Sequence, residues 1–174
     1  MSLVEKYALL PDEIDRRSLE AVENCLPPLN GLDGAERYVV RRIVRAEGDP
    51  DIANLVGFSP GAVEQGIRAV RSGADVLTDV RMVEVGISKT LLNRCGVITR
   101  CRIDAPETAH RAEKEGTTRS VAAMRELTPH LDGSIVAVGN APTALLALLD
   151  LVREGLAKPA LIIGMPVGFI ACAE

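Results

Sequence analysis

The last third of the chain alternates short apolar segments with a helix-like segment, and this pattern restricts the fold more than any other feature of the sequence. Residues 134–138 (SIVAV) and 160–163 (ALII) predict strands. Between them, residues 143–154 (TALLALLDLVRE) predict a helix that ends at Gly155. Alternating strands and helices are typical of an α/β fold with a mainly parallel sheet.

Earlier residues continue the alternation. Apolar residues three to five positions apart predict helices at 11–25 and 35–46. A third helix is expected at 59–72, with Ser59 as its N-cap and Pro60 at its first position. The remaining expected elements are strands near 75–78 and 97–102 and an acidic helical stretch from about 105 to 127. No linker or internal repeat divides these segments, so we expect one domain over residues 1–174.

Composition excludes several classes of function. The net charge is −4 and aromatic residues make up only 2%, so a nucleic-acid interface is not expected. The two most apolar windows are interrupted by Gly, Asn, Pro and Thr, which argues against a membrane span. The four cysteines lack the spacing of metal ligands, so we expect no metal site and interpret the cysteines as reduced thiols of a cytoplasmic protein.

Three loops follow predicted strands: residues 77–79, 138–142 and 164–169. In open parallel sheets, ligands bind beyond the carboxyl ends of the strands, where such loops lie. The alternative is that each loop is only a tight turn, and spacing does not decide between the two readings. The Gly-Asn-Ala-Pro corner at 139–142 passes directly from strand to helix, so its backbone N–H groups converge on one spot, where an acidic or polar group usually sits.

Each of the other polar segments allows two interpretations. Residues 117–120 (TTRS) are either an N-cap followed by a solvated arginine or a clamp for a carboxylate. Arginines at 41, 42 and 45 are either solvated or suited to an acidic ligand. His110 and His130, the only histidines, have no neighbours that indicate catalysis, and no dinucleotide or Walker motif is present.

Several of these segments together resemble the precorrin-8X methylmutase family, also called cobalt-precorrin-8 methylmutase, of cobalamin biosynthesis. The matching segments run in family order along nearly the whole chain: IDRRSL, ERYVVRRIV, GDPD, VLTDVRMVEVGI, GTTRSVAAM, DGSIVAVGNAPTALLALLDLV and KPALIIGMPVGF. The resemblance implies a Rossmann-like α/β fold, a homodimer, and a cofactor-free isomerase. The implied reaction moves a methyl group from C-11 to C-12 of the tetrapyrrole and yields hydrogenobyrinate or its cobalt form.

The resemblance also assigns the site. The tetrapyrrole carries many carboxylates, which arginines and backbone N–H groups at helix starts can bind. On this basis the Gly-Asn-Ala-Pro corner is expected to face the ring or one of its acid side chains. The expected substrate-binding residues are Arg17, Ser18, Thr78, Asp79, Arg119, Ser120, Gly139, Asn140, Met165 and Gly168.

One residue departs from the family pattern. The family's catalytic histidine, a general acid, corresponds by resemblance to Arg45. Arginine stays protonated near neutral pH and is a poor proton donor, although it can hold a ring electrostatically. Glu47, Asp49 or a substrate carboxylate are the nearest alternative acids. Three hypotheses therefore remain: a methylmutase with a different acid, a non-catalytic protein that binds the corrinoid, and an unrelated nucleotide-binding domain.

Overall fold

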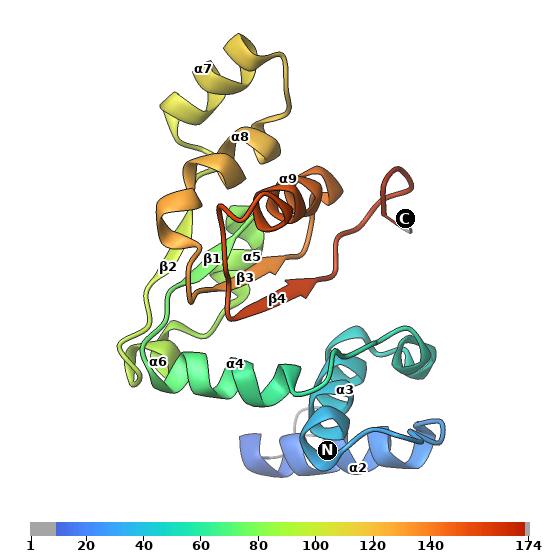
Figure 1. Cartoon of the computed structure of the whole chain (residues 1–174). Coiled ribbons are helices and arrows are strands. Elements are labelled where there is room, and N and C mark those ends of the chain that lie inside the picture. Colours follow the sequence, from blue (N-terminus) through green and yellow to red (C-terminus); the bar gives the residue numbers. More distant parts are fainter. Residues whose placement is uncertain (1–9, 173–174) are drawn as a thin grey trace, which may run out of the picture. The chain divides into compact units, whose positions relative to one another are not determined.

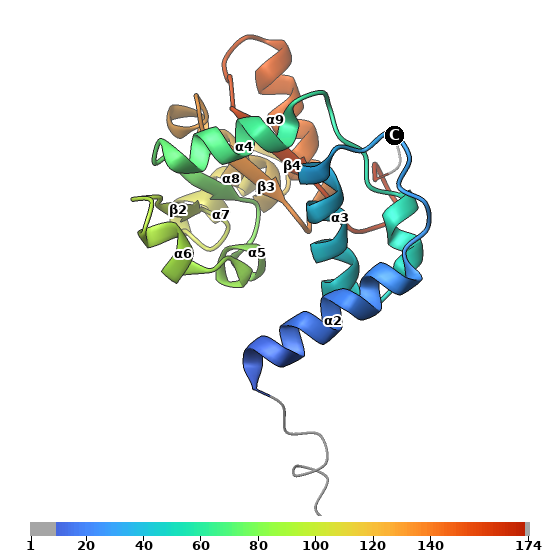
Figure 2. The ribbon, with the colours of Figure 1, turned by 90° about the horizontal axis from the view of Figure 1, so that it is seen from below.

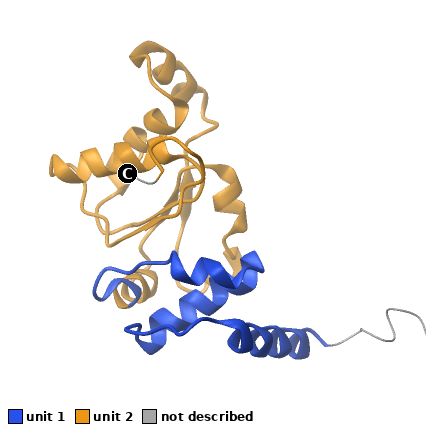
Figure 3. Ribbon diagram, turned by 90° about the vertical axis from the view of Figure 1, so that its right-hand side faces the viewer, with its two compact units in different colours: residues 1–63 blue, residues 64–174 orange. Residues whose placement is uncertain are grey.

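The computed structural model describes residues 10–172. Two compact units divide the chain, residues 1–63 and residues 64–174 (Figure 3). The expectation of a single domain over 1–174 stays a prediction.

The first unit is helical. It contains α2 (Pro11–Cys25), α3 (Gly34–Glu47) and the short 3₁₀ helix η1 (Pro50–Asn54), and α2 and α3 pack against each other. Asp33 begins α3 with a capping box, because its carboxylate accepts the N–H of Glu36 while the Glu36 side chain accepts the N–H of Asp33. The apolar stripes predicted at 11–25 and 35–46 meet in a small core that contains Val22, Leu29, Val40, Val44 and Ala53.

The second unit is built on a sheet of four parallel strands, which confirms the predicted α/β class (Figure 1). Its strands are β1 (Val76–Thr78), β2 (Thr99–Cys101), β3 (Ile135–Val138) and β4 (Leu161–Gly164). The order across the sheet is β2-β1-β3-β4, so β1 and β3 are central. All four lie at the predicted positions, and their carboxyl ends share one edge of the sheet.

Helices cover both faces of this sheet (Figures 1 and 2). On one face, α8 (Arg119–Glu126) and α9 (Pro142–Arg153) pack on Leu77 and Val136, both fully buried. On the other face, α4 (Ala62–Arg71) and α6 (Lys89–Asn93) pack on Val76 and Ile135. The alternation of neighbouring strand residues between the two faces gives each face its own apolar core. The other elements are α5 (Arg81–Gly86), α7 (Pro106–Glu115), which packs on α8, and η2 (Thr128–His130).

Two predicted helices are wrong in their bounds, and a glycine explains each. Gly61 has φ +73°, a left-handed conformation that a helix cannot continue through, so α4 begins at Ala62 and Ser59 is not its N-cap. Gly116, with φ +61°, likewise ends α7. The hydroxyl of Thr118 then starts α8 by accepting the N–H of Val121 at 3.2 Å, so the stretch from 105 to 127 is two helices rather than one.

Across residues 10–172, no helix combines the length and apolarity that crossing a bilayer would need. The same residues contain no cluster of His, Cys, Asp or Glu that could hold a metal ion. Cys25, Cys95, Cys101 and Cys172 are free thiols.

Candidate active site

The predicted loops after β3 and β4 lie side by side at the carboxyl edge of the sheet. The Met165 N–H donates to the Val138 carbonyl at 2.9 Å, and the Val167 N–H donates to the Asn140 carbonyl at 3.3 Å. A little further on, a Cβ atom added to Gly168 would lie 3.8 Å from the ring of Pro142, the last residue of the corner. The structure therefore brings together Gly139, Asn140, Met165 and Gly168, four of the predicted site residues.

Asp79 follows β1 and occupies the spot at which the corner's N–H groups converge. One carboxylate oxygen accepts the N–H of Gly139 at 3.1 Å, and the other accepts the N–H groups of Asn140 at 2.9 Å and Ala141 at 2.7 Å. An acidic or polar group was expected at this spot, and it is the chain's own carboxylate. These N–H groups are therefore not free to bind an acid side chain of the ring, while the expectation that the corner faces the ring stays a prediction.

Thr78 and Asp79 are also too deeply buried to touch a ligand with their side chains. Thr78 is 0% and Asp79 2% exposed. The Thr78 hydroxyl has no hydrogen-bond partner within the described residues. As direct substrate contacts these two residues do not fit, whereas Gly139 and Asn140 are partly exposed.

Arg119 and Ser120 begin α8, close to the start of α9. The hydroxyl oxygens of Thr118 and Thr143 are 3.3 Å apart and join the two helix starts. Arg119 is exposed and Ser120 partly exposed. The positive ends of two helix dipoles thus lie beside a guanidinium group, an arrangement that suits a carboxylate. Sequence reasoning did not single out Thr143, although a threonine directly after the proline of a strand-to-helix corner was the available signal.

In the first unit, Arg17 and Ser18 already have partners on their own helix. Arg17 Nε donates to Glu13 Oε1 at 2.6 Å, and the Ser18 hydroxyl donates to the carbonyl of Ile14 at 2.7 Å. Hydrogen bonds from Arg16 and Arg17 lower the pKa of Glu13 to about 2. A ligand carboxylate at Arg17 would therefore have to compete with Glu13.

Arg45 lies on α3 and forms an ion pair with Asp15 of α2. Arg42 approaches the same carboxylate, with its Nη1 atom 3.8 Å from Asp15 Oδ1. Of the alternative acids, Asp49 caps η1 by accepting the N–H of Asp51 at 2.9 Å, whereas Glu47 is exposed at the end of α3. Asp49 is thus already used in a structural hydrogen bond, while Glu47 is accessible.

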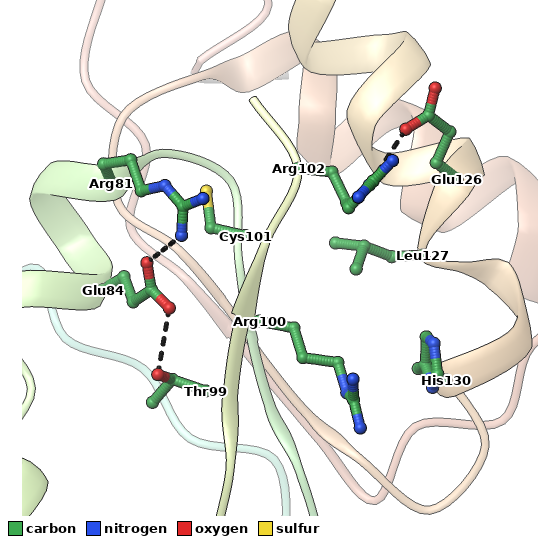
Figure 4. Close-up of a pocket in the computed structure, with 9 residues that line it drawn as sticks. All are labelled: Arg81, Glu84, Thr99, Arg100, Cys101, Arg102, Glu126, Leu127 and His130. Atoms are coloured by element: carbon green, nitrogen blue, oxygen red, sulfur yellow. Dashed lines mark hydrogen bonds and ion pairs between the residues drawn. The ribbon is translucent and has the colours of Figure 1, made fainter. Parts of the chain in front are cut away.

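A cavity of about 470 Å³ runs along the edge strand β2 of the second unit, away from the predicted residues (Figure 4). Arg100 and Arg102 line it on one side of the strand, while Thr99 and Cys101 point to the other (Figure 4). The rest of its lining is Arg81, Glu84, Glu126, Leu127 and His130.

Each arginine of this cavity is matched by a carboxylate. Arg81 contacts both Glu84 and Asp104, and its hydrogen bonds are the largest influence on Asp104, whose pKa they lower. Burial alone would raise the pKa of Glu84, but hydrogen bonds from Arg81 and Thr99 lower it below its ordinary value. Arg100 likewise pairs with Asp75. These neutralised arginines offer little to a further anion, and charges on a short edge strand protect it from pairing with another chain.

The sequence and the fold both match known proteins. The family model of precorrin-8X methylmutase matches residues 13–174. The chain belongs to the precorrin-8X methylmutase family. It is 39% identical over 165 residues to the cobalt-precorrin-8 methylmutase of Priestia megaterium. The alignment covers 94% of this chain and 72% of that protein. It is 41% identical over 146 residues to the precorrin-8X methylmutase of Pseudomonas aeruginosa. This alignment covers 84% of this chain and 70% of that protein.

A solved methylmutase structure also has this fold. The crystal structure of precorrin-8X methylmutase from Thermus thermophilus matches with a TM-score of 0.84 and 40% identity, over 92% of this chain and 77% of that one. A second structure, titled a precorrin-8X methylmutase related protein, matches with a TM-score of 0.78 and 31% identity, over 89% of this chain and 80% of that one. Membership in the methylmutase family removes the unrelated nucleotide-binding domain from consideration.

Proposed function

We propose that the protein is an isomerase of cobalamin biosynthesis that moves a methyl group from C-11 to C-12 of precorrin-8X or cobalt-precorrin-8. The products are hydrogenobyrinate and its cobalt form, cobyrinate. The observation that carries the proposal is the family match over residues 13–174. An intramolecular methyl shift neither oxidises the ring nor adds a group to it, so the proposed reaction uses no cofactor.

In this proposal, the ring's acid side chains bind at the start of α8. Arg119 supplies a charged, exposed donor, and Ser120 adds a hydroxyl group. Asn140, Met165 and the backbone at Gly139 and Gly168 form the adjoining wall at the carboxyl edge of the sheet. The contacts between Thr118 and Thr143 and between Val167 and Asn140 support this grouping.

In the helical unit, Arg17, Ser18 and Arg45 are the residues proposed to act on the ring. Here Arg45 holds the electron-rich ring electrostatically, because a guanidinium group keeps its proton near neutral pH. A methyl shift that also needs a proton on the ring then requires another donor, and the accessible Glu47 carboxyl is the candidate within the chain. We therefore expect turnover to be slow.

We further propose a cytoplasmic homodimer. The segment after β4 exposes apolar side chains: Met165, Val167, Phe169 and Ile170, with Phe169 fully exposed. Contiguous exposed apolar side chains mark surfaces that associate. Light scattering tests the assembly, and a species of 18.5 kDa at every concentration would contradict it. The four free thiols are consistent with a reducing compartment.

The decisive experiment incubates the purified protein with precorrin-8X and follows the absorption spectrum and mass of the pigment. Formation of hydrogenobyrinate, whose mass equals that of the substrate but whose spectrum differs, supports the proposal. An unchanged spectrum after prolonged incubation, in a preparation that binds hydrogenobyrinate, would support a corrinoid-binding protein instead.

A further inference from the structure

We infer that Asp79 is a positioning residue, which sets the place of Asn140 in the site without touching the substrate itself. The expected effect on ligand binding rests on the proposed function. The role of Asp79 in holding Asn140 rests on the hydrogen bonds alone. Asp79 and Asn140 are 61 residues apart in sequence and are joined by a direct hydrogen bond.

The N–H groups of the corner need a hydrogen-bond acceptor from elsewhere in the protein, because the corner itself supplies none for them. Gly139 and Asn140 follow the last residue of β3, and Ala141 is the N-cap of α9, so their N–H groups precede the first helical hydrogen bonds. Asp79 supplies two carboxylate oxygens to these three donors at 2.7–3.1 Å. Hydrogen bonds to an ionised acceptor are stronger than those between neutral groups, so this single side chain fixes the whole corner.

Asp79 is itself held in place. It follows directly on the central strand β1, and its own N–H lies 3.4 Å from the Ala137 carbonyl of β3. On the other side of the corner, a Cβ atom at Gly139 would come within 2.8 Å of Val83 Cγ2, so α5 packs tightly against this glycine. The corner is therefore clamped between a buried carboxylate and a helix.

The clamp extends to the residues that face the proposed ligand. The Asn140 carbonyl accepts the N–H of Val167, which belongs to the loop that carries Met165 and Gly168. A shift of Asn140 would move that loop as well. Asp79 therefore acts on the ligand through the Asn140 side chain and through this loop, so only part of its effect should be lost when the Asn140 side chain is removed.

A double-mutant cycle tests this coupling. Asp79→Asn keeps the shape but replaces one acceptor oxygen with an NH₂ group that faces other N–H donors. We expect it to weaken hydrogenobyrinate binding about ten- to a hundredfold when Asn140 is present, and by a clearly smaller factor in the Asn140→Ala background, where only its effect on the loop remains. Equal losses in both backgrounds would overturn the inference. Asp75→Asn is the matched control, because Asp75 lies before β1 and pairs with Arg100 instead.

Amide hydrogen exchange of the unaltered protein provides a second test that needs no variant to fold. The N–H groups of residues 139–141 should exchange slowly without ligand, and hydrogenobyrinate should not slow them further. Rapid exchange that becomes slow only with hydrogenobyrinate would overturn the inference, because the ligand would then be their acceptor. A failure of the unaltered protein to bind hydrogenobyrinate would instead contradict the proposed function and leave the exchange result to decide the role of Asp79.

Discussion

Replacement of Arg45 with histidine tests the chemistry most directly, because it restores the group expected at this position of the family. An imidazole has an ordinary pKa of about 6.5 and can donate a proton near neutral pH, which a guanidinium group does poorly. General-acid help of this kind is worth roughly 10²- to 10⁴-fold in rate. We therefore expect Arg45→His to increase kcat on precorrin-8X by about this factor.

The structure indicates that the fold will tolerate this change. Arg45 is partly exposed, and its ion pair with Asp15 is of the kind that contributes about 0–1 kcal/mol to stability. Asp15 would remain beside the new imidazole and raise its pKa, since a nearby carboxylate favours the protonated form. The gain in activity should therefore be present below that raised pKa and decline as the pH rises through it.

Turnover is followed by the spectral change to hydrogenobyrinate between pH 5 and pH 9. Arg42→His is the matched control, because Arg42 lies one turn earlier on α3 and faces the same Asp15 carboxylate, 3.8 Å away. The control should leave the rate near that of the unaltered protein. Full activity of the unaltered protein that is unchanged or lost in Arg45→His would refute the reasoning, because another residue would then be the acid.

Three further changes have defined outcomes. Arg119→Ala should weaken hydrogenobyrinate binding by about 1.5–3 kcal/mol in an absorbance titration, whereas Arg125→Ala, on the same helix, should not. Glu84→Gln should lower the free energy of unfolding by about 1 kcal/mol at pH 7, since Glu84 is buried but its arginine partner is half exposed. Because hydrogen bonds lower the pKa of Glu84, this difference should shrink in thermal melts as the pH falls below about 4.5, and a constant difference would contradict the assignment. Gly139→Ala should destabilise the protein by about 1–3 kcal/mol through its clash with Val83 at 2.8 Å, and adding Val83→Ala should recover most of the loss.

The sheet could be predicted from sequence because its signals are local. Each strand is a short apolar run next to a turn residue, and the run at 134–138 is apolar at successive positions, so that Val136 enters one core and Ile135 the other. The predicted helix bounds were wrong where a single residue determines the end of the helix. A glycine can continue a helix or leave it with positive φ, and here the Pro60-Gly61 dipeptide, a common turn signal, was the local difference between Gly61, just before α4, and Gly66, inside it.

The site was harder to predict because its main hydrogen bonds join residues far apart in the chain. The pattern of strand, Gly-Asn-Ala-Pro and helix correctly indicates converging N–H groups, but it cannot say whether their acceptor comes from a ligand or from the protein. Asp79 could equally have been a substrate contact by its position after β1, and only its 2% exposure and its three bonds identify it as the internal acceptor. Because the Asp79 carboxylate already accepts the corner's N–H groups, these groups cannot also bind the ring's acid groups. Side chains must then bind the acid groups. That consequence makes Arg119, rather than the corner's backbone, the residue whose loss should cost the most binding energy.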